Sequence, residues 1–135
     1  MGLSGAKCAL EVSNGMTFLD LIVRQVEYLN TTHHVNVPLI LMTSFNTLGD
    51  TIPILKKYDN TNVRIKTFNQ SRYPRILKDT LLPSAGSFGD DNEHWYPPGH
   101  GDLYAALLHS GVLRQLIDEG KEYLFVSNVD NLGAM

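Results

Sequence analysis

Apolar residues near the N-terminus recur at helical spacing, at Phe18, Ile22, Val26 and Leu29. This spacing places them on one face of a helix, so it predicts an amphipathic helix over residues 18–31. Thr17, with Asp20 three positions later, resembles a capping box and marks the start of that helix.

The next apolar positions form runs instead of a helical stripe. Residues 37–43 are almost uninterrupted apolar, which is typical of a strand buried on both faces of a parallel sheet. Residues 63–68 show a weaker alternating pattern and predict a second strand. Residues 123–127 form a short apolar run and predict a third strand.

Helical patterns and a long loop separate these strands. Residues 47–58 predict a short helix that contains Pro53, which requires the helix to begin close to the proline. Residues 102–119 predict a helix with a break at Ser110 and Gly111 and a stop at Gly120. Residues 69–101 are mostly loop, and a loop of this length inside a compact domain is usually functional.

The order of the predicted elements is α-β-α-β-loop-α-β, which favours an α/β fold with a parallel sheet and right-handed connections. Ligands of such sheets bind beyond the carboxyl ends of the strands. Gln70 follows one predicted strand, Asn128 and Asp130 follow another, and His100 lies in the loop between them. We therefore expect these residues to meet at one edge of the sheet.

Charge and cysteine content narrow the classes of partner. The net charge is −3, from 11 basic and 14 acidic residues, so no overall basic field favours nucleic acid or an anionic membrane. No apolar run has the length of a transmembrane segment. Cys8 is the only cysteine, which excludes an intramolecular disulfide and favours a reducing, cytoplasmic location.

Residues 96–102 read Tyr-Pro-Pro-Gly-His-Gly-Asp and are the most distinctive stretch of the chain. The prolines remove backbone donors, and Gly99 and Gly101 free the backbone to turn and to approach a ligand closely. Asp102 stands where a helix is predicted to start, so the loop could grip an anionic ligand at a helix N-terminus. The alternative is a surface turn with a capping Asp.

Long motifs resemble one enzyme family across essentially the whole chain, at residues 17–21, 41–47, 67–75, 95–102, 120–123 and 127–134. The chain resembles the eukaryotic UTP–glucose-1-phosphate uridylyltransferases, also called UDP-glucose pyrophosphorylases. The resemblance implies a Rossmann-like (GT-A-like) nucleotidyltransferase fold with a mostly parallel, incomplete sheet, and residues 1–135 would be a partial catalytic domain. It implies UTP and glucose 1-phosphate as substrates, UDP-glucose and pyrophosphate as products, and Mg²⁺ as cofactor.

The resemblance also implies roles for single residues in nucleotide and phosphate binding. Lys7 matches the catalytic lysine that closes the phosphate-binding loop. Gln70 matches a residue that recognises uracil, and Gly99 lets backbone groups reach the same base. His100 corresponds to a residue that contacts the sugar phosphate.

The same comparison makes Asp130 the Mg²⁺-binding carboxylate near the α-phosphate, and it places Asn128 against the ribose or hexose. Taken without the resemblance, Asp130 is more typical of a helix cap after a strand. In the same way, Lys7 could be a solvated lysine near the chain terminus.

The family pattern is longer than this sequence. We expect the glycine-rich head of the phosphate loop, a second phosphate-binding lysine and the C-terminal β-helix oligomerisation domain to be missing, and Ala6 replaces the usual proline. One alternative is therefore a truncated product that binds a nucleotide or a partner without turnover. Another is a UDP-N-acetylhexosamine pyrophosphorylase, although the motifs at 69–75 and 96–102 fit the glucose enzyme better.

Overall fold

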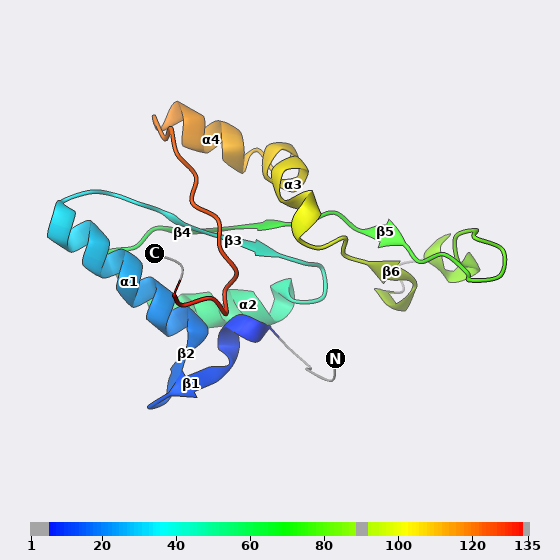
Figure 1. The fold of residues 1–135 in the computed structure, drawn as a ribbon, viewed down its shortest axis with the longest axis horizontal. Coiled ribbons are helices and arrows are strands. Elements are labelled where there is room, and N and C mark those ends of the chain that lie inside the picture. Colours follow the sequence, from blue (N-terminus) through cyan, green and yellow to red (C-terminus); the bar gives the residue numbers. More distant parts are fainter. Residues whose placement is uncertain (1–5, 89–91, 134–135) are drawn as a thin grey trace.

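Two parallel strands, β3 and β4, lie between two layers of helices in the computed structural model, which describes residues 6–88 and 92–133 (Figure 1). Helices α1 and α2 lie on one side of the strands, and α3 and α4 lie on the other. The bounds of these main elements are α1 (Phe18–His33), β3 (Leu39–Thr43), α2 (Leu48–Leu55), β4 (Ile65–Asn69), α3 (Leu103–His109) and α4 (Val112–Asp118). The predicted α/β class with parallel pairing is therefore confirmed.

Alternation along the strands serves two separate cores, because successive side chains point to opposite faces of a sheet. Leu39 and Leu41 pack toward a core formed with α1 and α2, whose buried members are Leu19, Val23, Tyr58 and Val63. Ile40 and Met42 pack toward the other core, whose buried members are Phe68, Ala106, Leu107, Val112 and Leu116. The apolar run of residues 39–42 reflects this double role, although these residues are only half-buried because the described sheet has two strands.

Helix α1 begins where the sequence predicts it. Thr17 and Asp20 form a capping box: the Thr17 hydroxyl accepts from the Asp20 N–H, and the Asp20 carboxylate accepts from the Thr17 N–H at 2.8 Å. The helix ends at His33, two residues later than predicted, and His34 follows in the left-handed conformation. The local capping signal therefore fixes the start of the helix more firmly than its end.

The predicted break between Ser110 and Gly111 is also present. Helix α3 ends at His109, and Gly111 has a φ of +78° before α4 begins at Val112. Gly120, with a φ of +75°, follows the end of α4. Helix α2 is shorter than predicted: Pro53 lies inside it, and residues 56–58 continue as a 3-10 turn, η2 (Lys56–Tyr58).

Two antiparallel ribbons add to the predicted elements. β1 (Glu11–Ser13) pairs with β2 (Met16–Thr17) around a turn in which Asn14 and Gly15 both have positive φ. Asn-Gly is the typical sequence of such a turn, so this signal was available in the sequence. β5 (Tyr73–Pro74) pairs with β6 (Trp95–Tyr96) inside the stretch predicted as loop.

Short 3-10 helices account for the other ordered segments of the described chain. They are η1 (Lys7–Ala9), η3 (Ala85–Phe88), η4 (Asn92–His94) and η5 (His100–Asp102).

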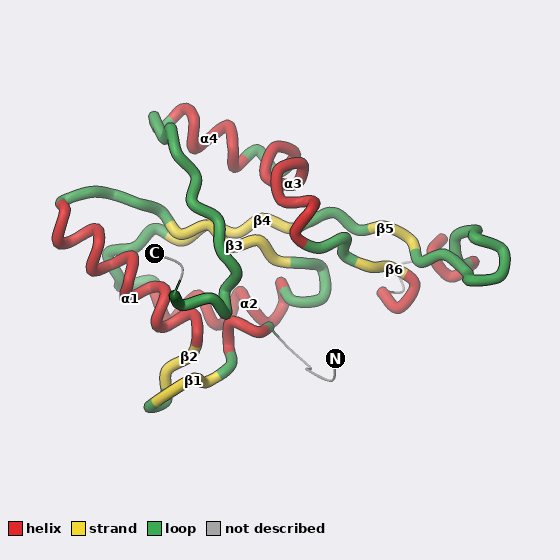
Figure 2. Tube along the Cα trace, viewed as in Figure 1, coloured by secondary structure: helices red, strands yellow, loops and turns green. Residues whose placement is uncertain are grey.

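The prediction of a strand at residues 123–127 is wrong. The segment after α4 is an extended loop that crosses the molecule toward α2 (Figure 2). A strand needs a hydrogen-bonding neighbour, and none of the described strands pairs with this segment. Its apolar side chains consequently face solvent: Tyr123 is 92% exposed and Phe125 is 70% exposed.

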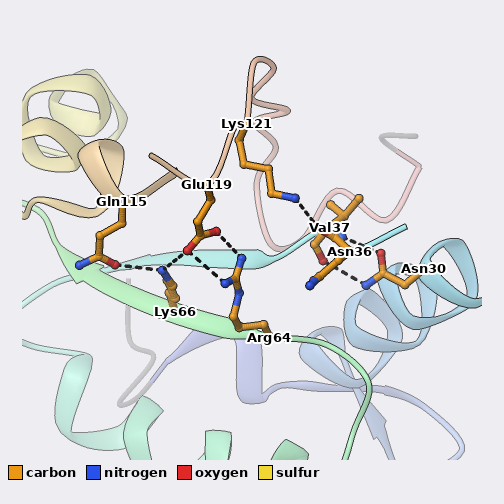
Figure 3. Close-up of polar contacts among 8 residues, drawn as sticks. All are labelled: Asn30, Asn36, Val37, Arg64, Lys66, Gln115, Glu119 and Lys121. Atoms are coloured by element: carbon orange, nitrogen blue, oxygen red, sulfur yellow. Dashed lines mark hydrogen bonds and ion pairs between the residues drawn. The ribbon is translucent and has the colours of Figure 1, made fainter. Parts of the chain in front are cut away.

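Polar contacts hold the C-terminal end of α4 over the beginning of β4 (Figure 3). Glu119 receives both terminal nitrogens of Arg64, and Lys66 Nζ lies 3.1 Å from Glu119 Oε1 and 2.9 Å from Gln115 Oε1. Hydrogen bonds from Arg64 and then Lys66 lower the pKa of Glu119. The bidentate geometry of the arginine gives this contact a fixed orientation.

A second set of contacts in Figure 3 fixes the entry to β3. The buried Asn30 side chain bonds the backbone of Val37 in both directions, at 3.1 Å and 2.8 Å. Lys121 Nζ donates to the Asn36 carbonyl at 2.6 Å. None of the helices in the described ranges is long and apolar enough to cross a membrane.

Candidate functional site

The carboxyl ends of β3 and β4 carry a compact set of polar groups. Thr43 Oγ1 donates to Asn69 Oδ1 at 2.6 Å, and the Gln70 N–H donates to the Thr43 carbonyl at 2.9 Å. These contacts extend the strand pairing by one residue beyond β4. Gln70 therefore leaves the sheet in a defined direction, as expected for a ligand-facing loop at this edge.

Gln70 meets the Gly99 loop across 29 residues of sequence. The Gly99 N–H donates to Gln70 Oε1 at 2.8 Å, so two residues assigned to the same base by the family resemblance are in direct contact. Gly99 has a φ of +88° and a ψ of −155°, a conformation that residues other than glycine rarely adopt. The glycine at this position is thus required by the backbone.

His100 follows directly in η5 and is exposed, so its imidazole is accessible to a ligand at this edge. Asp102 is buried, with 8% of its surface exposed. It stands at the start of α3, as the sequence predicts, but its side chain does not cap the helix, which contradicts the alternative of a surface turn with a capping Asp. Within the described chain its carboxylate accepts a hydrogen bond from the Ser71 N–H. Asp102 Oδ2 can reach the Ser71 N–H because the loop after β4 and the loop before α3 lie side by side.

A second group of predicted residues lies beside η1. Lys7 Nζ and Asp130 Oδ2 are 3.6 Å apart, and 53% and 44% of the two side chains are exposed. Lys7 belongs to η1, and Asp130 belongs to a turn closed by the Asn131 N–H and the Asn128 carbonyl at 3.1 Å. Residues 1–5 of the phosphate-loop tail and Ala134 of the Asp130 motif lie outside the described residues.

The six residues are thus arranged as two groups instead of one. Gln70 and Gly99 are in contact just after the end of β4, with His100 next in η5, whereas the turn of Asp130 contacts Lys7 of η1. Figure 1 shows the end of the segment after α4 well away from the carboxyl end of β4. Asn128 and Asp130 do not follow a strand, so the expectation that a strand end brings them to the Gln70 edge is wrong. Asn128 is exposed in the same turn.

The pKa values of Asp20, Tyr58 and Cys8, around α1, η2 and η1, are shifted by their surroundings. Burial would raise the pKa of Asp20, but hydrogen bonds from Lys57, Thr17 and Tyr58 outweigh it and lower that pKa well below the usual range. Burial together with the Asp20 hydrogen bond raises the pKa of Tyr58 to about 12. Burial likewise raises the pKa of the Cys8 thiol, next to Lys7, which makes it a poor nucleophile.

Two contacts near the site were not anticipated from the sequence. One is the buried Asp102–Ser71 hydrogen bond, and the other is the stacking of Arg72 over the Trp95 ring at 4.7 Å from its centroid. Both join segments more than 20 residues apart, so neither leaves a local pattern. The signal that could have found them is the shared position of residues 69–75 and 95–102 on either side of one long loop.

An α/β fold with parallel strands and polar loops at their carboxyl ends defines the class of proteins that bind ligands, nucleotides among them, at this edge of the sheet. The family model of UTP–glucose-1-phosphate uridylyltransferase matches residues 1–135. The chain belongs to this family.

Similar proteins span much more sequence than this chain. It is 55% identical over 135 residues to a probable UTP–glucose-1-phosphate uridylyltransferase of Schizosaccharomyces pombe, covering 100% of this chain and 27% of the relative. It is 54% identical over 137 residues to the UTP–glucose-1-phosphate uridylyltransferase of Solanum tuberosum, covering 28% of that protein. The chain thus spans little more than a quarter of these relatives.

Solved structures agree with this assignment. A mutant UDP-glucose pyrophosphorylase from Leishmania major, in complex with UDP-glucose, matches with a TM-score of 0.83 and 43% identity, covering 100% of this chain and 29% of that one. A protein described as UDP-glucose phosphorylase from Trypanosoma brucei matches with a TM-score of 0.84 and 42% identity, with the same coverage. The arrangement of helices and strands described above is therefore shared with these proteins.

Proposed function

We propose that this chain is the part of a UTP–glucose-1-phosphate uridylyltransferase that binds the uridine nucleotide and one side of its phosphates. In the reaction, a phosphate oxygen of glucose 1-phosphate attacks the α-phosphorus of UTP. The bond between the α-phosphorus and the bridging oxygen breaks, pyrophosphate leaves, and UDP-glucose forms. Residues 1–135 would be a partial catalytic domain with a Rossmann-like, mostly parallel sheet in the complete enzyme.

The Lys7–Asp130 pair is the geometric observation that carries this proposal. The two residues are far apart in sequence, yet they lie 3.6 Å apart and are both half-exposed. A lysine ammonium supplies a mobile positive charge to phosphate oxygens, and it stabilises charge that develops as the phosphoryl group is transferred. An accessible pair of opposite charges is therefore suited to a phosphate ligand that separates them.

The second group of residues would hold the nucleotide base and the sugar phosphate. Gln70 would offer its amide to the edge of uracil, and Gly99, whose N–H donates to Gln70 in this structure, would let backbone groups reach the same base. His100 would offer a donor to the sugar phosphate. Asn128 would face the ribose or hexose. Holding the two substrates in line lowers the entropic part of the barrier, which is the main contribution expected of these residues.

Mg²⁺ is the cofactor that we propose, with Asp130 as its protein ligand. The donor chemistry fits, because the Asp130 carboxylate is accessible and Mg²⁺ prefers one or two carboxylates together with phosphate and water oxygens. When bound, Mg²⁺ would neutralise phosphate charge.

We also propose a cytoplasmic location, which the single cysteine of the chain supports.

An exchange experiment tests the proposed function. The matching segment of the Solanum tuberosum enzyme is replaced by residues 1–135, and UDP-glucose formation from UTP and glucose 1-phosphate is measured. We expect activity with glucose 1-phosphate and little with N-acetylglucosamine 1-phosphate. A folded hybrid without activity, or one that prefers the N-acetylated substrate, would contradict the proposal.

For the 135-residue chain alone, the same reasoning predicts nucleotide binding without turnover. Transition-state stabilisation depends on several preorganised groups, and the 135 residues span 27% of the Schizosaccharomyces pombe relative. We expect no measurable uridylyltransferase activity from the purified chain. Release of pyrophosphate above the background of a mock purification would show that this expectation is wrong.

A further inference from the structure

The Gln70–Gly99 contact belongs to a longer ribbon. Tyr73 pairs with Tyr96 and Pro74 pairs with Trp95, and the Arg75 N–H donates to the His94 carbonyl at 2.8 Å. Gln70 and Gly99 stand opposite each other in this same antiparallel register. The two-stranded arm starts where β4 ends. The candidate base-binding pair, Gln70 and Gly99, is therefore the pair of this arm that lies nearest the β3–β4 sheet.

Two prolines interrupt the backbone hydrogen bonding of this arm. Pro97 and Pro98 have no N–H to donate, so the ribbon cannot continue by backbone pairing toward Gly99. In this stretch, side-chain acceptors replace the missing backbone pairing. Gln70 Oε1 accepts from the Gly99 N–H, and Asp102 Oδ2 accepts from the Ser71 N–H. The two bonds run in opposite directions across the same pair of loops.

Asp102 is the better shielded of the two acceptors. It is 8% exposed, and its own N–H lies 3.2 Å from the Gly99 carbonyl, so its backbone and its side chain hold both loops at once. A buried carboxyl oxygen that accepts a backbone N–H has few alternative positions, because leaving that donor unpaired would cost about 1–3 kcal/mol.

We propose that Asp102 is a positioning residue that sets Gln70 and Gly99 for base recognition; this inference rests on the proposed function. Because the Gly99 N–H donates to Gln70 Oε1, the Gln70 amide is held in one orientation, and its Nε2 donor points in a defined direction. A fixed donor favours a carbonyl acceptor on the base, which uracil has and which cytosine replaces with an amino group at the equivalent position. Asp102 would thus contribute to the preference for uridine over cytidine nucleotides without touching the ligand.

The test uses the 135-residue chain at high dilution, with three variants. Asp102→Ala removes the acceptor, Asp102→Asn keeps an acceptor oxygen, and Asp118→Ala is a control that removes an exposed carboxylate from α4. Residue-resolved amide hydrogen exchange is measured at Ser71 and Gly99, and dissociation constants are measured for UDP-glucose and CDP-glucose.

We expect Asp102→Ala to speed exchange at both amides about tenfold, including Gly99, whose hydrogen-bond acceptor is Gln70 and not Asp102. It should also lower the UDP-glucose to CDP-glucose preference about tenfold, whereas Asp102→Asn and Asp118→Ala should stay near wild type. Should Asp102→Ala unfold the chain, Asp102→Glu, which displaces the acceptor by one methylene, is expected to give a smaller change in the same direction.

Unchanged exchange at Gly99 in a variant that keeps α3 protected would overturn the positioning role. Failure of the wild-type chain to bind UDP-glucose would instead overturn the proposed function, while the exchange measurement would still decide whether Asp102 couples the two loops.

Discussion

At Asp130, a substitution can distinguish a role in catalysis from a role in stability. Its side chain is half-exposed and contacts Lys7 at 3.6 Å, and it lies in a turn without a following helix in the described chain. An exposed ion pair of this kind contributes about 0–1 kcal/mol to stability. Any large effect of replacing Asp130 would therefore come from the ligand.

We predict that Asp130→Asn in the exchanged full-length enzyme lowers kcat by about 10²–10³-fold, equivalent to ~3–4 kcal/mol of transition-state stabilisation. The substitution keeps the shape of the side chain but removes the charge. The measurement is kcat at saturating Mg²⁺, together with thermal melting of both proteins. A near-normal kcat would remove the proposed metal ligand.

Asp20 has the opposite character, because it supports the fold and lies outside the candidate site. It joins Thr17, Lys57 and Tyr58, and its side chain is 9% exposed. Its lowered pKa means that folding stabilises the ionised form. The stabilisation is therefore complete above about pH 4, the ordinary range of Asp, and is lost as the pH falls below it.

We predict that Asp20→Asn lowers the free energy of unfolding by about 1–3 kcal/mol at pH 7. The difference from wild type should shrink as the pH falls below about 4. Denaturant titrations of the two proteins across pH 2–7 measure this, with Asp59→Asn as an exposed control. A constant difference over that range would show that the charge of Asp20 is unimportant.

At the scale of elements, glycines with positive φ follow the ends of α3 and α4. Gly111 has a φ of +78°, and a Cβ built there meets nothing within 4 Å, so only backbone conformation opposes a side chain. Gly49 lies inside α2 without a positive φ and is equally open. The two positions therefore isolate the effect of backbone conformation.

We predict that Gly111→Ala destabilises the chain by about 1–2 kcal/mol, the usual penalty for a left-handed L-residue. Gly49→Ala should instead stabilise it by about 0.5–1 kcal/mol, because alanine is the better helix former. Thermal and denaturant unfolding of both variants check the opposite signs. Equal effects would mean that the α3–α4 break is not held by Gly111.

The same scale explains what could be predicted from the sequence. Thr17 with Asp20 and Ser110 with Gly111 act within a few residues, so the helix boundaries that they set were predictable. The β5–β6 ribbon and the Asp102–Ser71 bond join segments 20 or more residues apart, and no local pattern encodes them. The predicted strand at 123–127 failed because strand formation depends on a neighbour, which periodicity cannot supply.

The positions of the candidate site residues were also only partly predictable from the sequence. The resemblance selected Gln70 and Gly99, and the structure places them in contact. Lys7 and Asp130 are also brought together, but their roles toward phosphate and Mg²⁺ stay predictions. The separation of these two pairs was not foreseen, because it depends on where the segment after α4 crosses the molecule.

At the scale of the whole molecule, the exposed apolar residues predict self-association. Tyr123, Leu124, Phe125 and Val126 are between 46% and 92% exposed in one continuous segment. The described sheet also has only two strands, which leaves strand edges open to other chains. Both features favour contacts between copies over contacts with solvent.

We predict that the 135-residue chain associates at micromolar concentration, and that Phe125→Lys reduces this association. Analytical ultracentrifugation over a concentration series measures it, with Tyr28→Lys, on an exposed face of α1, as the control. A monodisperse wild-type monomer with a sharp melting transition would contradict the prediction.

The two-sided apolar character of β3 also has a consequence for alignment between the strands. Leu39, Ile40, Leu41 and Met42 are all aliphatic, so sliding β3 by one residue would exchange its two faces with little change in hydrophobicity. The side-chain hydrogen bond at the end of the strand breaks this degeneracy, because only one alignment places Thr43 Oγ1 against Asn69 Oδ1. Thr43 and Asn69, which lie where the candidate site begins, therefore also favour the correct pairing of β3 with β4, so replacing either one would weaken that alignment as well as change the site.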